Sequence, residues 1–330
     1  MGERITRYAV GDADAAAVQS LATRLAGELT DDLTEADLRR VALMCHDLPD
    51  GLRAALVDFR LGAPGAPEGG FVITGVPFDD ADLQPTPGTT ADNPRGPEIR
   101  RANAVLLLLA SLLGDPFALA GVHEGRLIND IFPVKGDEET QLASSSSGGL
   151  VWHNEDAYSD HRADWLLLMC LRNPEPRVPT TFARLADARP DLAGVADALH
   201  QKSYTMLPDS SHGPETGEST PRLISVLDGH RDAPFVRIDP AFMTAVGDDA
   251  RRALATAVAA FERNLQDVTL APGDVLVIDN YRAVHGRRPF EARYDGTDRW
   301  LRAVNVTAGL HGFTGEREGG HKRALRAATY

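Results

Sequence analysis

The chain has 330 residues, a formal net charge of −14 at pH 7 and 43% hydrophobic residues. This composition is that of an ordinary globular protein, and the length permits one large core or two smaller ones. The acidic balance argues against binding nucleic acid through its phosphates, which requires a basic face. No apolar run approaches the roughly 18 residues that a membrane span needs, and we see no signal peptide. We therefore expect a cytoplasmic protein that binds neither nucleic acid nor membranes.

The two cysteines, Cys45 and Cys170, lie far apart in the chain, each inside an apolar pattern. Their spacing fits neither a zinc site nor a disulfide framework. Buried thiols in a reducing compartment are the expected state, which agrees with a cytoplasmic location.

Three helices are predicted near the N-terminus. Apolar residues at helical spacing predict the first over residues 14–29. Thr34 and Asp37 have the spacing of a capping box, which opens a second helix that runs to Cys45. A third apolar stripe covers residues 52–59. Because none of these stripes carries catalytic residue types, we expect residues 1–65 to be a helical packing segment.

The pattern then changes from helical to β. Short β-rich runs predict strands over residues 71–77 and 127–133. A helix over residues 98–113 lies between them, and its nearly continuous apolar block predicts deep burial. Asn129 and Asp130 interrupt the second strand as polar residues.

The second half of the chain is mainly β. Residues 207–221 lack any periodicity and predict a loop, a candidate lid over a site. Asp295-Gly296 is a strong hairpin signal, expected to join residues 287–294 to a strand over 300–306. Further strands are predicted over residues 165–171, 180–183, 223–227, 235–238, 268–270 and 275–278, and helices over 191–201 and 248–264.

Many short strands with helices gathered at the N-terminus are typical of a β-sandwich or jelly roll with added helices. A doubly wound parallel sheet would need helices and strands in alternation, which the chain lacks. We expect a mainly β protein with a single domain over residues 1–330. Its jelly-roll core spans about 70–307, and the Gly- and Arg-rich residues 308–330 form a tail that we expect to be poorly ordered.

His153-Asn154-Glu155 is the first candidate for a metal site. A His and a carboxylate two residues apart in extended backbone point to the same side of the strand. Such a triplet arises easily by chance, and His230-Arg231-Asp232 is a second example, beside Gly229, that we interpret as a surface turn. His123 is interpreted as an ordinary loop residue.

The C-terminal half offers a partner for the first triplet. His285 follows a buried strand and precedes a glycine, as expected at a pocket mouth, and Arg299 comes fourteen residues later. Two His and one carboxylate on one face of an octahedron form the ligand set of non-haem Fe(II) oxygenases, whereas structural zinc would favour a fourth protein ligand. An Arg nearby could offer a bidentate fork to a carboxylate co-substrate.

The chain resembles the clavaminate synthase-like family of Fe(II)/2-oxoglutarate oxygenases. Within that family it is most similar to bacterial asparagine oxygenase and to the arginine β-hydroxylases of antibiotic pathways. The resemblance covers residues 71–307. It is carried by His153-Asn154-Glu155-Asp156-Ala157-Tyr158, His161-Arg162-Ala163-Asp164, Cys170-Leu171-Arg172-Asn173-Pro174, Gly273-Asp274, His285-Gly286-Arg287 and Tyr294-Asp295-Gly296-Thr297-Asp298-Arg299-Trp300.

The resemblance implies a double-stranded β-helix core and a set of site residues. It implies that the iron ligands and catalytic residues are His153, Glu155 and His285, that 2-oxoglutarate is held by Arg299 and Thr181, and that the amino-acid substrate is contacted by Asn129, Asp239 and Arg302. Thr180 is the neighbour with which Thr181 is most easily confused.

Two departures from the family pattern concern the substrate. Relatives carry an Arg four residues after the one at Arg299, where it pairs with the substrate α-carboxylate, and this chain has Ala303 there. Arg302 is one residue off, and a one-residue shift on a strand turns the side chain to the other face. Near Asp239 the second acid of the arginine hydroxylases is missing.

The activity implied by the resemblance is hydroxylation of an unactivated C–H bond of a polar or basic amino acid, with the free amino acid as the first expectation. Fe(II), 2-oxoglutarate and O2 take part, and succinate and CO2 are the co-products. The same chemistry on a conjugated or carrier-tethered amino acid, or with desaturation as its outcome, is the alternative that Ala303 favours. A non-catalytic binding module is a lesser one.

Overall fold

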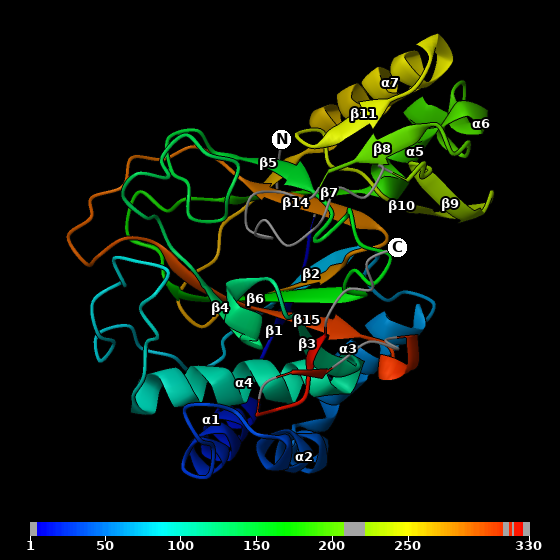
Figure 1. Cartoon of the computed structure of the whole chain (residues 1–330). Helices are drawn as coiled ribbons and strands as arrows, with labels where there is room; N and C mark the ends of the chain where they lie inside the picture. Colours follow the sequence, from blue (N-terminus) through cyan, green and yellow to red (C-terminus); the bar gives the residue numbers. More distant parts are fainter. Residues whose placement is uncertain (1–4, 208–221, 313–316, 319, 326–330) are drawn as a thin grey trace.

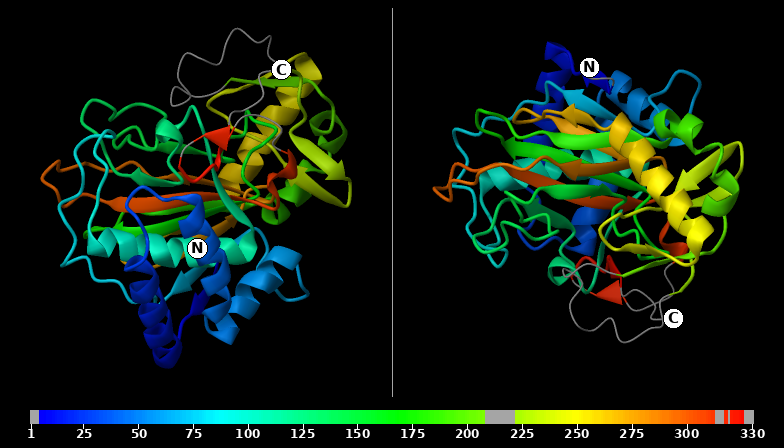
Figure 2. Two further views of the ribbon diagram at one scale, coloured as in Figure 1. Left: turned by 60° about the horizontal axis from the view of Figure 1, so that its bottom comes forward. Right: turned by 90° about the horizontal axis from the view of Figure 1, so that it is seen from above.

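Two β-sheets face each other in the computed structural model, which describes residues 5–207, 222–312, 317–318 and 320–325 (Figure 1). Helices from the N-terminal part cover one sheet, and a second group of helices packs beside the other. The first group lies at the bottom of Figure 1 and the second at its top right, and Figure 2 shows the same helices from two other directions. A mainly β protein with added helices, as the strand pattern predicts, is confirmed. The candidate lid over residues 207–221 lies, except for Leu207, outside the described residues.

Four helices form the layer beneath the larger sheet. The capping box predicted at Thr34 is present, with the Thr34 side chain and Asp37 bonded reciprocally to each other's backbone N–H groups. The last of the four is almost wholly buried, and it lies between the other three and the sheet. These helices are α1 (Asp12–Ala26), α2 (Glu35–Met44), α3 (Asp50–Leu61) and α4 (Pro97–Leu113).

The larger sheet is mostly antiparallel, and its central strand β15 pairs with three neighbours. In order the sheet contains β1 (Thr6–Ala9), β2 (Gly70–Thr74), β13 (Val275–Asp279), β6 (Trp165–Arg172), β15 (Trp300–Thr307), β3 (Asp115–Leu119), β17 (Ala324–Leu325) and β16 (Arg317–Glu318), with β4 (Ile128–Ile131) paired to β15. The strand β17 belongs to the tail expected to be poorly ordered. It is buried and pairs with β3.

The smaller sheet faces the larger one across an apolar core to which Phe182, Leu168 and Leu276 contribute. Its strands, in order, are β12 (Gln266–Val268), β7 (Thr180–Arg184), β14 (Ala283–Arg287) and β5 (Leu150–His153). Beside it lie α5 (Leu185–Leu192), α6 (Ala196–Leu199), α7 (Asp248–Asn264) and two hairpins, β8 (Tyr204–Met206) with β11 (Met243–Ala245) and β9 (Leu227–His230) with β10 (Ala233–Val236).

The predicted Asp295-Gly296 hairpin is wrong. The strands on either side, β14 and β15, belong to different sheets, and residues 288–299 cross irregularly between them. The turn is built instead around Asp298, whose carboxylate accepts the backbone N–H groups of Arg293 and Tyr294 at 2.8 and 2.6 Å. A buried carboxylate therefore satisfies the backbone that a ladder would otherwise pair.

Two further element boundaries differ from the predictions. The helix expected over residues 191–201 is two short helices, with Pro190 inside the first and Gly194 between them. A proline in a helix removes a hydrogen bond and a glycine weakens the continuation, which explains the split. The strand expected over 223–227 lies instead at Leu227–His230. Cys45 and Cys170 are free and buried, as predicted. None of the described helices is both long and apolar enough to cross a membrane.

Candidate active site

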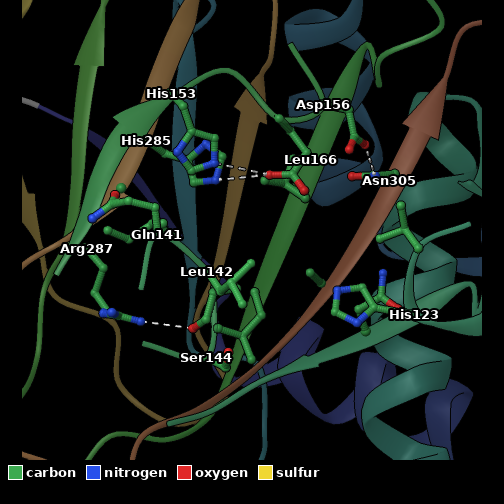
Figure 3. A pocket seen from close by; sticks show the side chains of 18 of the residues that line it. His123, Gln141, Leu142, Ser144, His153, Asp156, Leu166, His285, Arg287 and Asn305 are labelled. Carbon is green, nitrogen blue, oxygen red and sulfur yellow. Dashed lines mark hydrogen bonds and ion pairs between the residues drawn. The ribbon is translucent and has the colours of Figure 1, made fainter. Parts of the chain in front are cut away.

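A pocket of about 480 Å³ lies between the two sheets. Strands β5, β7 and β14 line it from the smaller sheet, and β4, β6 and β15 line it from the larger one. This volume suits a small ligand. The polar side chains that converge on the pocket are drawn in Figure 3.

His153 and His285 face each other across the β5–β14 ladder. They are register partners in this antiparallel pair, and their ring centroids are 4.7 Å apart. The Nδ1 atom of His153 lies 2.8 Å from the carbonyl oxygen of Val151. Because that nitrogen donates to the carbonyl, the neutral His153 ring has its lone pair on Nε2, which faces Glu155.

Glu155 completes a convergent group of three. Its Oε2 atom lies 3.7 Å from His153 Nε2 and 3.5 Å from His285 Nε2, and the three ligand atoms lie within 4.8 Å of one another. These separations are longer than good hydrogen bonds. Two imidazole nitrogens and one carboxylate oxygen, facing a common point and open on the pocket side, fit the ligand set of non-haem Fe(II).

Two asparagines hold this group in place. Asn154, between the two residues of the triplet, is buried; its Nδ2 donates to the Asn280 carbonyl at 2.8 Å, and its Oδ1 accepts the Ile238 N–H at 2.9 Å. The backbone N–H of Glu155 donates to Asn280 Oδ1 at 2.8 Å. The middle residue of the triplet thus anchors the end of β5, while its neighbours point into the pocket.

The electrostatics of the group are those of a cation site. Burial would lower the pKa of His153, but the adjacent carboxylate of Glu155, together with the charge of Asp239, raises that pKa to about 9. Burial would also raise the pKa of Glu155, and its contacts with the two histidines hold it well below the usual range. Burial lowers the pKa of His285. The carboxylate therefore stays ionised and attracts positive charge to the point between the rings.

Gly286 allows the strands to approach closely beside this point. A Cβ atom on it would lie 2.6 Å from the carbonyl oxygen of Leu150 and 2.9 Å from Thr181 Oγ1. No side chain fits in that space. The glycine after His285 is therefore required by the close pairing of β14 with β5 and β7.

Arg299 lies buried in the pocket wall beside Thr180. Its Nη2 donates to Thr180 Oγ1 at 3.0 Å, and its Nε has no hydrogen-bond partner among the described residues. Burial lowers the pKa of Arg299 to about 10. No acidic side chain in the described part of the chain forms an ion pair with it, so this guanidinium is available to an anionic ligand.

The structure places Thr180, and not the expected Thr181, beside Arg299. Thr180, not Thr181, lines the pocket and contacts the guanidinium, whereas Thr181 lies against Gly286. Successive side chains on a strand point to opposite faces, so a one-residue choice decides the assignment. The alignment of motifs alone could not make that choice between two adjacent threonines.

Arg287 is a second buried arginine near Arg299. Its two terminal nitrogens donate to the Ala143 carbonyl at 3.0 Å and to Ser145 Oγ at 2.7 Å. In Figure 3 it extends away from the two histidines toward that segment. Burial, and the charge of Arg299, lower its pKa to about 9. It ties the 143–145 wall of the pocket to β14.

Arg302 does not reach the pocket. It lies on the opposite face of β15, where its guanidinium pairs with Asp130 at 2.9 Å and also bonds to Asn103 on α4. Asp130 in turn accepts the Trp300 indole N–H at 2.7 Å. Arg302, expected at the substrate, therefore points away from the pocket, because the period of the strand turns it into the layer beneath the sheet.

Asn129 and Asp239, expected at the substrate, both line the pocket. Asn129 is the register partner of Ala303 across the β4–β15 ladder, and its Oδ1 atom is buried with no hydrogen-bond partner among the described residues. Asp239 lies close enough to His153 for its charge to affect the pKa of that ring.

Asp156, Asn305 and His123 are among the pocket residues that were not identified as site residues from the sequence. Asn305 donates to the Asp156 carboxylate at 3.2 Å, and the pair lies across the pocket from the histidines in Figure 3. Asp156 has a φ of 49°, and His123, in the short helix His123–Gly125, has a φ of 47°. Positive φ at residues other than glycine often marks functional sites, but it cannot be read from a sequence.

The second His-x-acid triplet is a surface turn, as predicted. It joins β9 to β10, and the side chains of His230 and Asp232 are 77% and 89% exposed. The two triplets therefore differ in their surroundings and not in their residue types.

Comparisons with known proteins agree with this geometry. The family described as "Taurine catabolism dioxygenase TauD, TfdA family" matches residues 103–305, more than half of the chain. The chain is 37% identical to enduracididine beta-hydroxylase from Streptomyces hygroscopicus, over 91% of this chain and 93% of that protein. It is 38% identical to L-ornithine/L-arginine 3-hydroxylase from Catenulispora acidiphila, over 93% and 95%.

Two solved structures are also similar to this chain. The non-heme iron oxygenase OrfP, in complex with Fe, succinate and (3S)-hydroxy-L-Arg, has a TM-score of 0.85 and 36% identity, covering 97% of this chain and 99% of that one. Asparagine oxygenase, in complex with Fe(II), 2S,3S-3-hydroxyasparagine and succinate, has a TM-score of 0.89 and 33% identity, covering 98% and 99%. The double-stranded β-helix core expected from the sequence is confirmed by this similarity.

Proposed function

The chain belongs to the TauD/TfdA family of iron- and 2-oxoglutarate-dependent dioxygenases, and we propose that it hydroxylates an unactivated C–H bond of a polar or basic amino acid. One observation carries the proposal. Two imidazoles and a carboxylate converge on one point of a pocket whose wall holds a buried, unpaired arginine. The relatives that are named for hydroxylation of ornithine, arginine and asparagine support an amino acid as the substrate class.

In this proposal His153, Glu155 and His285 hold the iron. The carbonyl of Val151 fixes the tautomer of His153, and the hydrogen bond from Asn154 Nδ2 to the Ala283 carbonyl ties the end of β5 to β14. When bound, the iron supplies the oxidation of the C–H bond by O2, coupled to conversion of 2-oxoglutarate to succinate and CO2. The protein itself binds and orients the substrates, and it keeps water out of the pocket.

Arg299 and Thr180 would hold the distal carboxylate of 2-oxoglutarate. A carboxylate there would satisfy the orphaned Nε of Arg299, and a buried charge-assisted pair is stronger than an exposed one. Asn129 and Asp239 would face the amino acid from β4 and from the segment after β10. Desaturation in place of hydroxylation would use the same residues. A cytoplasmic location belongs to the proposal and is supported by the two free, buried cysteines.

The test is substrate-stimulated succinate release. The full chain, supplied with Fe(II), 2-oxoglutarate and O2, is screened against arginine, ornithine, lysine, asparagine, citrulline and histidine, each free and as its α-amide. At least one compound should raise succinate formation well above the rate without substrate and should gain one oxygen atom by mass. A set of compounds that gives neither effect would overturn the proposal.

A further inference from the structure

The substrate half of the pocket differs in polarity from the half that contains Arg299. On β15 the pocket-facing residues after Arg299 are Leu301 and Ala303, and across the ladder from Ala303 lies Leu168 of β6. Leu166 continues this apolar floor toward Asn305. The floor of the pocket therefore offers contact surface and no positive charge.

Asn129 adds a hydrogen-bond acceptor to this floor. It pairs with Ala303, so the two side chains lie on the same face of neighbouring strands. The Oδ1 atom of Asn129 is buried and has no donor among the described residues. An unsatisfied buried acceptor costs about 1–3 kcal/mol. The Asn129 Oδ1 atom therefore requires an N–H or O–H donor on the ligand. A carboxylate group has no such donor.

The basic side chains of the described lining are three histidines and three arginines, and in the proposed function His153 and His285 hold iron and Arg299 holds 2-oxoglutarate. Arg299 lies at Thr180, and Arg287 donates to Ser145 and Ala143. Arg126 donates to the backbone carbonyls of His123, Thr90 and Asp92.

Carboxylates also line this pocket. Besides Glu155, which is assigned to the iron, they include Asp156 and Asp239. A free amino acid brings a carboxylate of its own. In a low-dielectric pocket that anion would meet like charges, an apolar floor and an acceptor atom.

We propose that the substrate's carboxyl group enters the pocket in neutral form, joined through an amide or thioester bond, so that the enzyme hydroxylates an aminoacyl group and not a free amino acid. This inference rests on the proposed function, whose chemistry it leaves unchanged. An amide N–H next to the substrate carbonyl, or the α-amino group itself, would donate to Asn129 Oδ1. Ala303 leaves room for the group attached to the carbonyl.

The test compares one side chain in three forms: the free acid, the α-amide and the N-acetylcysteamine thioester. With wild-type protein, iron and 2-oxoglutarate, kcat/KM for a neutral form should exceed that of the free acid by at least about tenfold, because an anion without a partner is excluded. Preference for the amide over the thioester would identify a peptide-like source, and the reverse preference would identify a carrier-bound source. Either preference supports the proposal.

A variant pair tests the role of Ala303. Ala303→Arg places a cation on the floor and should shift the preference toward the free acid by at least about tenfold. Ala303→Met, with a side chain of similar length and no charge, should not shift it. Binding of 2-oxoglutarate, measured in each variant, shows that the pocket is intact. If Ala303→Arg does not fold, the wild-type comparison alone decides.

Two results would overturn the inference. If wild-type protein uses the free acid as well as or better than the neutral forms, the carboxyl group is bound as an anion, and the proposed function stands without this inference. If no form of any amino acid raises succinate release, the proposed function itself fails, and the inference fails with it.

Discussion

The buried arginines on the two sides of strand β15 differ in how many hydrogen-bond and ion-pair partners they have within the chain. On the face toward α4, Arg302 pairs with Asp130 and Asn103, and Asp130 also accepts from Trp300, so the charged group finds its partners within the chain. On the pocket face, Arg299 has one protein partner, Thr180, and its Nε has none among the described residues. Both arginines are 5% exposed or less.

This difference separates a structural role from a ligand-binding role. Buried polar groups in folded proteins are nearly always paired, and an unpaired one is costly. On the face toward α4 the polar groups are paired within the chain and stabilise the fold. On the pocket face the unsatisfied donor groups are available to a ligand. The four predictions below, ordered by expected effect, would sharpen or break this distinction.

His153→Ala should abolish catalysis and leave the fold intact. Loss of one of three candidate ligands removes the metal, and we expect substrate-stimulated succinate formation to fall by about 1,000-fold or more. The free energy of unfolding in urea should change by no more than about 1 kcal/mol. His230→Ala, in the exposed second triplet, is the matched control and should change neither quantity. Retained turnover in His153→Ala would show that the metal binds elsewhere.

Arg302→Met should destabilise the fold and leave the binding of 2-oxoglutarate intact. Removing one partner of a buried ion pair leaves the Asp130 carboxylate uncompensated, which costs about 3–5 kcal/mol of unfolding free energy. The Kd for 2-oxoglutarate should stay within about twofold of the wild-type value, since Arg302 faces away from the pocket.

The double variant Arg302→Met/Asp130→Asn is the control for this prediction. It removes both charges and keeps an acceptor for the Trp300 indole N–H, so most of the lost stability should return. Wild-type stability in the single variant would show that the pair does not stabilise this face.

Arg299→Gln should weaken the binding of 2-oxoglutarate. A hydrogen bond to a charged group is worth about 1.5–3 kcal/mol, so we expect the Kd to rise roughly 10- to 100-fold. Thr180→Val should raise the Kd by less than about tenfold, because it removes a neutral partner. Thr181→Val is the control, since that side chain lies against Gly286, and should leave the Kd unchanged. Equal effects of the two threonine variants would contradict the assignment of Thr180.

Asp37→Asn should have the smallest effect, since it lies in the helical layer far from the ligands. Burial would raise the pKa of Asp37, but hydrogen bonds from Thr30 and Thr34 outweigh it and lower the pKa. The carboxylate therefore stabilises the fold above its unfolded-state pKa of about 3.9, and this contribution is lost as the pH falls through the lower folded-state value. We expect a loss of about 1 kcal/mol at pH 7 that shrinks toward about pH 3 in urea unfolding. A loss independent of pH would exclude the charge as its cause.

Local signals were enough to predict much of the fold. The capping box at Thr34 and the apolar stripes predict α1 to α4 closely, because these helices are set by short-range spacing. The Asp295-Gly296 hairpin was wrong because a turn signal does not say which strands it connects. That choice depends on the long-range pairing of β15 with β6 and β4, which no short stretch of sequence encodes.

The candidate site was predictable in its residue types and less so in their orientation. His153, Glu155 and His285 are brought together as the motifs predict. Thr181 and Arg302 each lie one step along a strand from a residue that lines the pocket, and the period of two turns each step into a change of face. Asp156 and His123 are distinguished by a positive φ, which is a property of the folded backbone and cannot be predicted from their residue types.

The most direct measurement is an anaerobic titration of the protein with Fe(II) and 2-oxoglutarate, followed by visible absorption. If the open face of the pocket holds both ligands, the wild-type protein should develop a weak metal-to-ligand band that saturates with 2-oxoglutarate and is absent from His153→Ala. A wild-type protein that gives no band, or a His153→Ala protein that gives the same band, would contradict the account.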